Sequence, residues 1–215
     1  MKISPSLLAA DFANLQASVA KIESSVEMLH LDVMDGNFVP NISFGPCVIA
    51  ALRPHSKLFF DVHLMIERPE RYLEDFKKAG ADGISIHYES TENPAAALKT
   101  IREMGISPAI TISPDTPAEV VFPLLPLVDM VLVMTVYPGF GGQRLIPDCL
   151  LKARAIKDEI IRQGLSVSVQ ADGGVGPANI EDVARAGVDI AVAGSAVFGA
   201  ADPAAAIAAI REVTG

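Results

Sequence analysis

The sequence is poor in cysteine and has no long hydrophobic run. Cys47 and Cys149 form no C-x-x-C motif, and we interpret them as free thiols in a reducing compartment. No run approaches the roughly 18 apolar residues that a membrane span needs, and the N-terminus lacks the apolar core of a signal peptide. We therefore expect a cytoplasmic protein with no membrane partner.

Basic residues are also in the minority. Lys and Arg number 17 against 26 Asp and Glu, which gives a formal net charge of −9. This balance disfavours a nucleic-acid partner or an anionic membrane, since both attract a basic surface. A small anionic substrate stays possible, because backbone N–H groups can hold a phosphate in an acidic protein.

Apolar strand-like runs alternate with amphipathic helix-like runs along all 215 residues. Eight such β-then-α units, about 27 residues each, suit a closed barrel, and no linker interrupts them. We therefore predict an α/β fold, a single (β/α)8 TIM barrel forming one domain over residues 1–215. The alternative is a doubly wound sheet, but the glycine fingerprint usual after its first strand is missing. The predicted strands are 3–8, 29–34, 58–65, 83–87, 108–112, 130–136, 166–171 and 189–193, and the predicted helices are 14–25, 46–52, 69–79, 93–104, 117–125, 147–163, 178–186 and 203–213, with a short helix at 195–198.

The second predicted strand carries two polar residues on one face. Side chains alternate along a strand, so His30 and Asp32 point the same way. An imidazole and a carboxylate placed like this can bind a metal together. A buried, hydrogen-bonded His–Asp pair without a metal explains this stretch equally well.

Further polar residues stand at other strand ends, where (β/α)8 barrels place their sites. His63 ends the third strand and Asp172 closes the seventh. Two His and two Asp at one barrel mouth favour a divalent transition metal over an unmetallated polar cluster, with Zn²⁺, Fe²⁺ or Mn²⁺ as candidates. We interpret His87, whose only nearby carboxylate is Glu89, as a structural or supporting residue. Met34, Met65 and Met134 either line this site or belong to ordinary barrel packing.

The last three strand ends are rich in glycine. The segment Pro138–Gln143 contains Gly139, Phe140, Gly141 and Gly142; Gly173-Gly174 follows the seventh strand, and Gly194-Ser195 the eighth. Glycines let backbone N–H groups approach an anion closely. Each pair alone fits any tight turn, but three such loops side by side favour a phosphate-binding cradle.

These residues together resemble the ribulose-phosphate 3-epimerase family over essentially the whole chain. The matching motifs are Ser6-Leu7-Leu8-Ala9-Ala10-Asp11-Phe12, the stretch from His30 to Asn41, Asp61-Val62-His63-Leu64-Met65, Met134-Thr135-Val136 with Pro138 to Gln143, Asp172-Gly173-Gly174, and Ala193-Gly194-Ser195-Ala196-Val197-Phe198.

The resemblance implies roles for most of these residues. It implies metal ligands at His30, Asp32, His63 and Asp172, with Asp32 and Asp172 also as the catalytic acid–base pair. It implies one divalent ion per chain, Zn²⁺ being our first choice and Fe²⁺, Mn²⁺ or Co²⁺ the alternatives. Substrate contacts would come from Ser6, His63, Asp172 and the glycine-rich loops: Gly139, Phe140, Gly141, Gly142, Gly173, Gly174, Gly194 and Ser195.

The implied reaction is inversion at carbon 3 of a ketose phosphate through an enediolate, between D-ribulose 5-phosphate and D-xylulose 5-phosphate in the pentose phosphate pathway. We also expect a homo-oligomer. The sequence departs from the family pattern at Gln170-Ala171, Tyr137 and Arg144. Tyr137 and Arg144 border the phosphate loop, so an allulose-6-phosphate 3-epimerase or another ketose-phosphate epimerase is the alternative. A non-catalytic sugar-phosphate-binding barrel is a further alternative, although it need not keep the acid–base pair.

Overall fold

The computed structural model describes residues 1–213, in which eight parallel strands form one sheet. Their order is β1-β8-β7-β6-β5-β4-β3-β2. A single bridge between Ser6 and His30 joins β1 to β2 and closes the barrel. The predicted (β/α)8 barrel is therefore confirmed. The strands are β1 Lys2–Pro5, β2 Met28–Met34, β3 Phe59–Met65, β4 Gly83–His87, β5 Ser107–Ile112, β6 Met130–Met134, β7 Ser168–Asp172 and β8 Ile190–Ala193.

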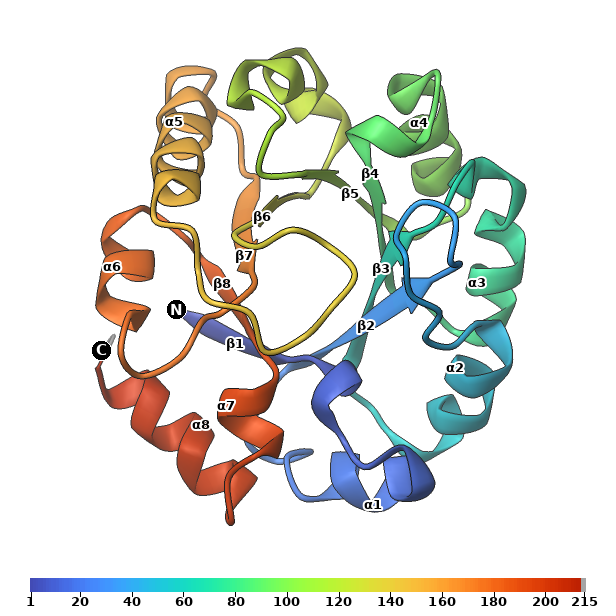
Figure 1. Cartoon of the computed structure of the whole chain (residues 1–215). Helices are drawn as coiled ribbons and strands as arrows, with labels where there is room; N and C mark the ends of the chain where they lie inside the picture. Colours follow the sequence, from blue (N-terminus) through green and yellow to red (C-terminus); the bar gives the residue numbers. More distant parts are fainter. Residues whose placement is uncertain (214–215) are drawn as a thin grey trace.

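Helices surround the strands as an outer ring (Figure 1). The α-helices are α1 Leu15–Ala20, α2 Pro46–Leu52, α3 Leu73–Ala79, α4 Pro94–Glu103, α5 Asp148–Arg162, α6 Ile180–Arg185, α7 Ser195–Phe198 and α8 Pro203–Glu212. No helix in residues 1–213 is long and apolar enough to cross a membrane.

The helix expected at 117–125 is wrong in type. Residues Ala118–Leu127 form a 3₁₀ segment, η6, which contains Pro123 and Pro126. A proline has no N–H to donate and its ring crowds the preceding turn, so two prolines three residues apart prevent a regular α-helix. The β5–β6 connection still covers the barrel, because Val121 and Leu125 are fully buried.

The first strand is shorter than expected, and the difference shapes the site. β1 stops at Pro5, and the Ser6 hydroxyl accepts a hydrogen bond from the backbone N–H of Leu8 at the start of a 3₁₀ turn. A serine in this capping position ends regular strand structure. Ser6 therefore stands at the barrel mouth instead of inside a continuous strand.

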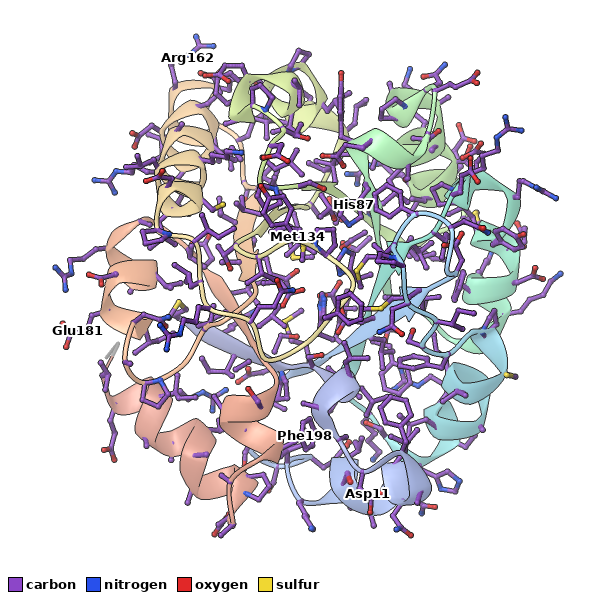
Figure 2. The ribbon with its side chains drawn as sticks, in the orientation of Figure 1. Asp11, His87, Met134, Arg162, Glu181 and Phe198 are labelled. Atoms are coloured by element: carbon purple, nitrogen blue, oxygen red, sulfur yellow. The ribbon has the colours of Figure 1, made fainter. Side chains whose placement is uncertain are left out.

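The strands are buried on both faces, but the two faces differ in chemistry. Outward side chains such as Leu31 and Phe60 join the main apolar core under the helices. Inside the barrel, Met28, Ala109, Met130 and Ile190 form a separate buried apolar cluster, which we call the floor. In Figure 2, His87 and Met134 lie near the barrel axis, while Arg162 and Glu181 project from its outer edge.

Candidate active site

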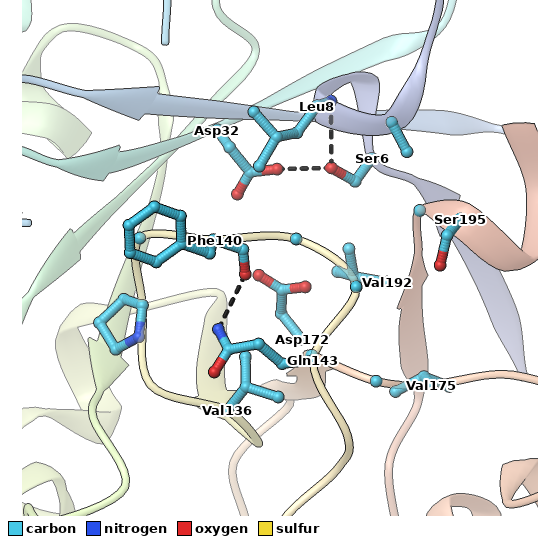
Figure 3. A pocket seen from close by; sticks show the side chains of 18 of the residues that line it. Ser6, Leu8, Asp32, Val136, Phe140, Gln143, Asp172, Val175, Val192 and Ser195 are labelled. Atoms are coloured by element: carbon cyan, nitrogen blue, oxygen red, sulfur yellow. Dashed lines mark hydrogen bonds between the residues drawn. The ribbon is translucent and has the colours of Figure 1, made fainter. Parts of the chain in front are cut away.

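A cavity of about 730 Å³ opens at the carboxyl end of the barrel, opposite the floor. In Figure 1, the loop between β6 and α5 crosses this mouth, and Figure 3 shows the cavity from close by. The methionines Met34, Met65 and Met134 line it. So do eleven of the thirteen residues expected in the site: Ser6, Asp32, Gly139, Phe140, Gly141, Gly142, Asp172, Gly173, Gly174, Gly194 and Ser195.

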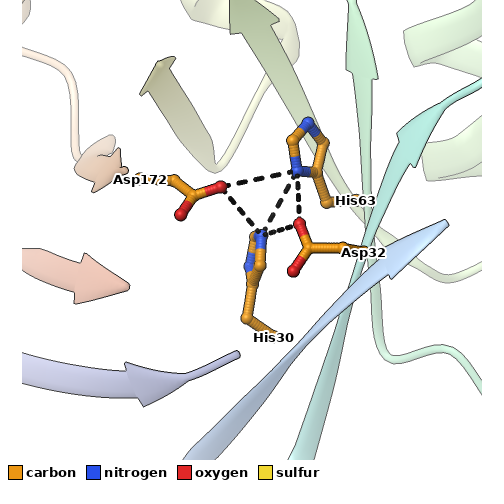
Figure 4. Close-up of side chains that lie close together, drawn as sticks. All are labelled: His30, Asp32, His63 and Asp172. Atoms are coloured by element: carbon orange, nitrogen blue, oxygen red, sulfur yellow. Dashed lines mark hydrogen bonds and ion pairs between the residues drawn. The ribbon is translucent and has the colours of Figure 1, made fainter. Parts of the chain in front are cut away.

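The other two, His30 and His63, are fully buried at the base of this cavity. Each directs one ring nitrogen toward Asp32 and Asp172 (Figure 4). His30 Nε2 lies 3.3 Å from Asp32 Oδ1 and 3.7 Å from Asp172 Oδ2. His63 Nδ1 lies 3.2 Å and 3.9 Å from the same two oxygens. The structure thus joins residues from β2, β3 and β7 in one cluster.

The spacing of these four atoms suits a cation. A tetrahedral zinc site with bonds of about 2.0–2.1 Å has ligand–ligand edges of about 3.4 Å. The two ring nitrogens are 3.3 Å apart, and all four ligand atoms lie within 4.8 Å of one another. Two imidazoles and two carboxylates match the preference of Zn²⁺ and Fe²⁺ for mixed nitrogen and oxygen ligands. The cluster could therefore hold one metal ion.

A buried carboxylate orients His30 from behind. His30 Nδ1 donates to Asp61 Oδ2 at 2.8 Å, and the amide of Gln170 donates to the same oxygen at 2.8 Å. A carboxylate only accepts, so the proton stays on Nδ1 and Nε2 faces the cluster. Metal-bound histidines commonly have such a partner.

A chain of hydrogen-bonding side chains, which we call the His63 relay, supports His63 in the same way. Its Nε2 lies 2.9 Å from His87 Nε2, and His87 Nδ1 lies 3.2 Å from Glu89 Oε2. If His63 Nδ1 is a ligand, its Nε2 carries the proton and donates to His87, which in turn donates to Glu89. Despite partial burial, hydrogen bonds from His87, Thr116 and the backbone of Ser113 lower the pKa of Glu89 to about 2, so this relay also ends on a carboxylate. The supporting role expected for His87 agrees with this arrangement.

The two aspartates of the cluster have opposite electrostatic environments. Burial alone would raise the pKa of Asp32, but the charge and hydrogen bonds of His30 and His63 hold it well below the usual range. Burial and the negative charge of Asp32 raise the pKa of Asp172 to about 7. Side by side, one carboxyl is ionised while the other can hold a proton, which is the arrangement that general acid–base chemistry needs.

The two histidines of the cluster also differ in pKa. Burial opposes a charged His30, but the carboxylates of Asp32 and Asp61 outweigh it and raise the pKa of His30 well above its usual range. Burial and the neighbouring imidazoles of His87 and His30 lower the pKa of His63 to about 4. His63 is therefore neutral at pH 7, whereas His30 must release a proton to become a metal ligand.

The glycine-rich loops approach one another so closely that side chains would not fit. A Cβ added to Gly173 would collide with Val136, and one on Gly174 would meet the backbone of residues Gln143–Leu145. Both glycines also have positive φ, +122° and +66°. The side-chain amide of Asn41 donates to the carbonyl of Gly139 at 2.9 Å, which ties the β6 loop to the β2 loop. The backbone thus forms a narrow rim at one side of the cavity.

The chain matches known proteins over nearly its full length. Residues 2–198 match the model of the ribulose-phosphate 3-epimerase family. The ribulose-phosphate 3-epimerase of Mycobacterium bovis is 46% identical, over 99% of this chain and 93% of that protein. The chain belongs to this family. The cytoplasmic isoform of the ribulose-phosphate 3-epimerase of Oryza sativa subsp. japonica is 44% identical, over 98% of this chain and 93% of that one.

Family membership makes this chain an enzyme, an isomerase acting on carbohydrates, as its resemblance to ribulose-phosphate 3-epimerases implied. A solved 3-hexulose-6-phosphate synthase has the same architecture, with a TM-score of 0.75 over the whole of both chains. At 22% sequence identity that likeness concerns the fold alone.

Sequence reasoning assigned no role to Asp61 or Gln170. Asp61 stands two residues before His63, on the same strand face, and this signal was available. Gln170 reaches Asp61 from β7 across the barrel, over a separation of 109 residues. No local pattern can predict such a contact.

Proposed function

We propose that this enzyme interconverts D-ribulose 5-phosphate and D-xylulose 5-phosphate by proton transfer at carbon 3, with one divalent metal ion per chain. The observation that carries the proposal is the pair of carboxyl groups from β2 and β7, one with a lowered and one with a raised pKa, beside a metal-binding cluster. Inversion of a carbon needs one group to remove a proton and another to return one from the opposite face.

Asp32 is placed to begin the reaction in one direction. It is ionised, and the Ser6 hydroxyl donates to its Oδ2 at 2.5 Å, which fixes the carboxylate (Figure 3). Asp32 accepts the carbon-3 proton from one epimer and leaves an enediolate. Asp172 then donates its proton to the other face of carbon 3, which gives the other epimer. In the reverse direction the two residues exchange roles.

His30, His63, Asp32 and Asp172 would hold the metal. When bound, it supplies Lewis-acid stabilisation for the negative charge that develops on the substrate oxygens. We propose Zn²⁺ first, because the mixed nitrogen and oxygen donor set suits it, while Fe²⁺, Mn²⁺ and Co²⁺ fit the same donors. Elemental analysis of protein from its native host would identify the ion.

The narrow glycine rim would bind the phosphate. Gly139 to Gly142, Gly173-Gly174 and Gly194-Ser195 all face the cavity that the cluster opens into. Backbone N–H groups at such loops are suitable anion donors. With a net charge of −9, the chain has little attraction for nucleic acid. We further propose that residues 1–215 form one catalytic domain, which works in the cytoplasm as a homo-oligomer.

The test uses the metal-loaded protein with ribulose 5-phosphate in deuterated water. We expect deuterium at carbon 3 of both epimers, and loss of turnover after thorough chelation. No exchange by the loaded protein would contradict the proposal. Allulose 6-phosphate, one carbon longer, is the competing substrate, because Tyr137 and Arg144 border the loop. A higher kcat/KM for the six-carbon sugar would reassign the substrate.

A further inference from the structure

Five buried polar atoms in the described part of the chain lack a hydrogen-bond partner within the protein. They are Ser4 Oγ, Asp61 Oδ1, Ser85 Oγ, Thr111 Oγ1 and Gln170 Oε1. All five side chains are completely buried. Buried polar atoms in folded proteins are almost always paired with protein or with ordered water.

All five belong to the inside of the barrel. Ser4, Asp61 and Gln170 each precede a residue of the site by two positions, so they share its strand face. Ser85 pairs in register with His63, and Thr111 with His87, so these two also point inward. The five come from β1, β3, β4, β5 and β7. We call this set the inner polar layer.

Two members of the layer, Asp61 and Gln170, are connected by hydrogen bonds to His30 of the His–Asp cluster. Asp61 Oδ2 accepts from both His30 and Gln170, which leaves Asp61 Oδ1 and Gln170 Oε1 unpaired. A buried carboxylate oxygen and a buried amide oxygen both need donors. No hydroxyl group of the layer donates to either oxygen, so bound water is the donor that the barrel interior offers, since water is stable where several polar atoms converge.

We propose that the inner polar layer binds ordered water molecules, and that Asp61 and Gln170 are positioning residues which couple this water to His30. Water donating to Asp61 Oδ1 and Gln170 Oε1 fixes the carboxylate plane. The fixed carboxylate holds the His30 ring with Nε2 toward Asp32 and Asp172. The water site stands on its own, whereas the consequence for metal binding rests on the proposed function.

The first experiment is a high-resolution crystal structure of the metal-free protein. We expect ordered water within hydrogen-bond distance of Asp61 Oδ1 and Gln170 Oε1. If neither atom has a water neighbour, the proposed site is wrong. This result does not depend on whether the protein binds a metal or turns over substrate.

The second experiment compares Zn²⁺ dissociation constants by competition with a chromophoric chelator. Asp61→Asn and the nearly isosteric Gln170→Leu should each weaken binding by about 10–100-fold, as partners of ligating histidines commonly do. Thr111→Val is the matched control, because it removes another unpaired atom of the layer, one that makes no hydrogen bond to Asp61 or Gln170. The dissociation constant of this variant should stay within about twofold of that of the unmodified protein. Equal weakening in all three folded variants would overturn the positioning role, and so would unchanged binding in Asp61→Asn and Gln170→Leu. Failure of the unmodified protein to bind Zn²⁺ would instead overturn the proposed function.

A spectroscopic measurement separates positioning from general loosening of the core. The chain has only four histidines, so their imidazole ¹⁵N signals can be assigned one by one. In the Zn²⁺-loaded protein, the His30 Nδ1 proton should appear at low field and exchange slowly, because it is bonded to a carboxylate. Asp61→Asn should move this proton upfield and leave the signals of His63 and His87 in place. An unmoved His30 signal in that variant would contradict the proposal.

Discussion

Two aspartates from strands 140 positions apart in the sequence acquire different proton affinities because their neighbours differ. Asp32 is surrounded by two imidazoles and the Ser6 hydroxyl, all of which favour its ionised form. Asp172 is buried beside the charge of Asp32, which favours its neutral form. Identical side chains therefore suit opposite tasks, and the difference is set by position alone.

Removing either carboxylate should disable one direction of proton removal. Asp32→Asn and Asp172→Asn keep the shape while removing the basic oxygen, and we expect epimerisation to fall by about 10²–10⁴-fold. In Asp172→Asn, only the epimer whose carbon-3 proton faces Asp32 should still exchange with deuterated solvent. In Asp32→Asn, the other epimer should exchange. NMR of both sugars with each variant is the measurement, and exchange of the same epimer in both would show that a single base acts.

Metal uptake should depend steeply on pH. At neutral pH without a cation, the raised pKa of His30 keeps a second proton on its ring, and a histidine must lose that proton to bind a metal. Asp172, whose pKa is about 7, can bind through one carboxyl oxygen while the other keeps the proton that the reaction needs. Apparent affinity should therefore rise as pH increases through neutrality, by roughly tenfold per pH unit for the one proton that His30 releases. His63, with a pKa of about 4, should contribute nothing in this range. Calorimetry in buffers of different ionisation enthalpy counts the protons, and an affinity that is flat across this range would contradict the assignment.

Among the elements, the loop after β7 depends on glycine for space as well as for conformation, because it packs against the loop after β6. Gly174 and Gly164 have the same φ, +66°, but only Gly174 is crowded. Gly164→Ala should lower the free energy of unfolding by about 1–2 kcal/mol through its backbone conformation alone and leave KM unchanged. Gly174→Ala should lower the free energy of unfolding by more than Gly164→Ala does. It should also raise KM, because the added Cβ would displace the backbone of Gln143 to Leu145. Denaturant titration and steady-state kinetics of both variants are the test; equal KM values would remove the loop from the substrate site.

The sequence predicts elements well where the signal is local. Buried strands are apolar runs ended by Gly or a polar residue, and helix ends have suitable residue types. Asp11 accepts from Ala13 N–H at the start of a 3₁₀ turn, and Gly80 adopts a left-handed conformation at the end of α3. The element at 118–127 differs from the α-helix expected at 117–125, because its apolar pattern suits a helix while two prolines determine the actual backbone. Prediction of the cluster succeeded because strand ends of a closed barrel must converge. The contact of Gln170 with Asp61 could not be predicted, because it depends on barrel diameter and stagger.

At the scale of the whole molecule, the barrel has one narrow junction. β1 and β2 share the single bridge at Ser6 and His30, while every other neighbouring pair has an extended ladder. The bond from the Ser6 hydroxyl to Asp32 crosses this junction at 2.5 Å. Ser6, which lines the cavity, therefore also closes the barrel. A change that separates β1 from β2 would also displace the side chains at the cavity.

The apolar floor fills one end of the barrel interior, and the cavity opens at the other end. Met28, Ala109, Met130 and Ile190 fill the end opposite the mouth, and His30 and His63 have no exposed surface. A cation held by these histidines would then leave through the mouth, across the cavity in which we propose that the sugar phosphate binds. We therefore expect the ion to enter before the substrate and to depart after the product. Zinc loss to an added chelator should consequently slow about tenfold when a competitive sugar-phosphate analogue is present at ten times its dissociation constant, whereas an unchanged rate would mean that the ion has a second way out.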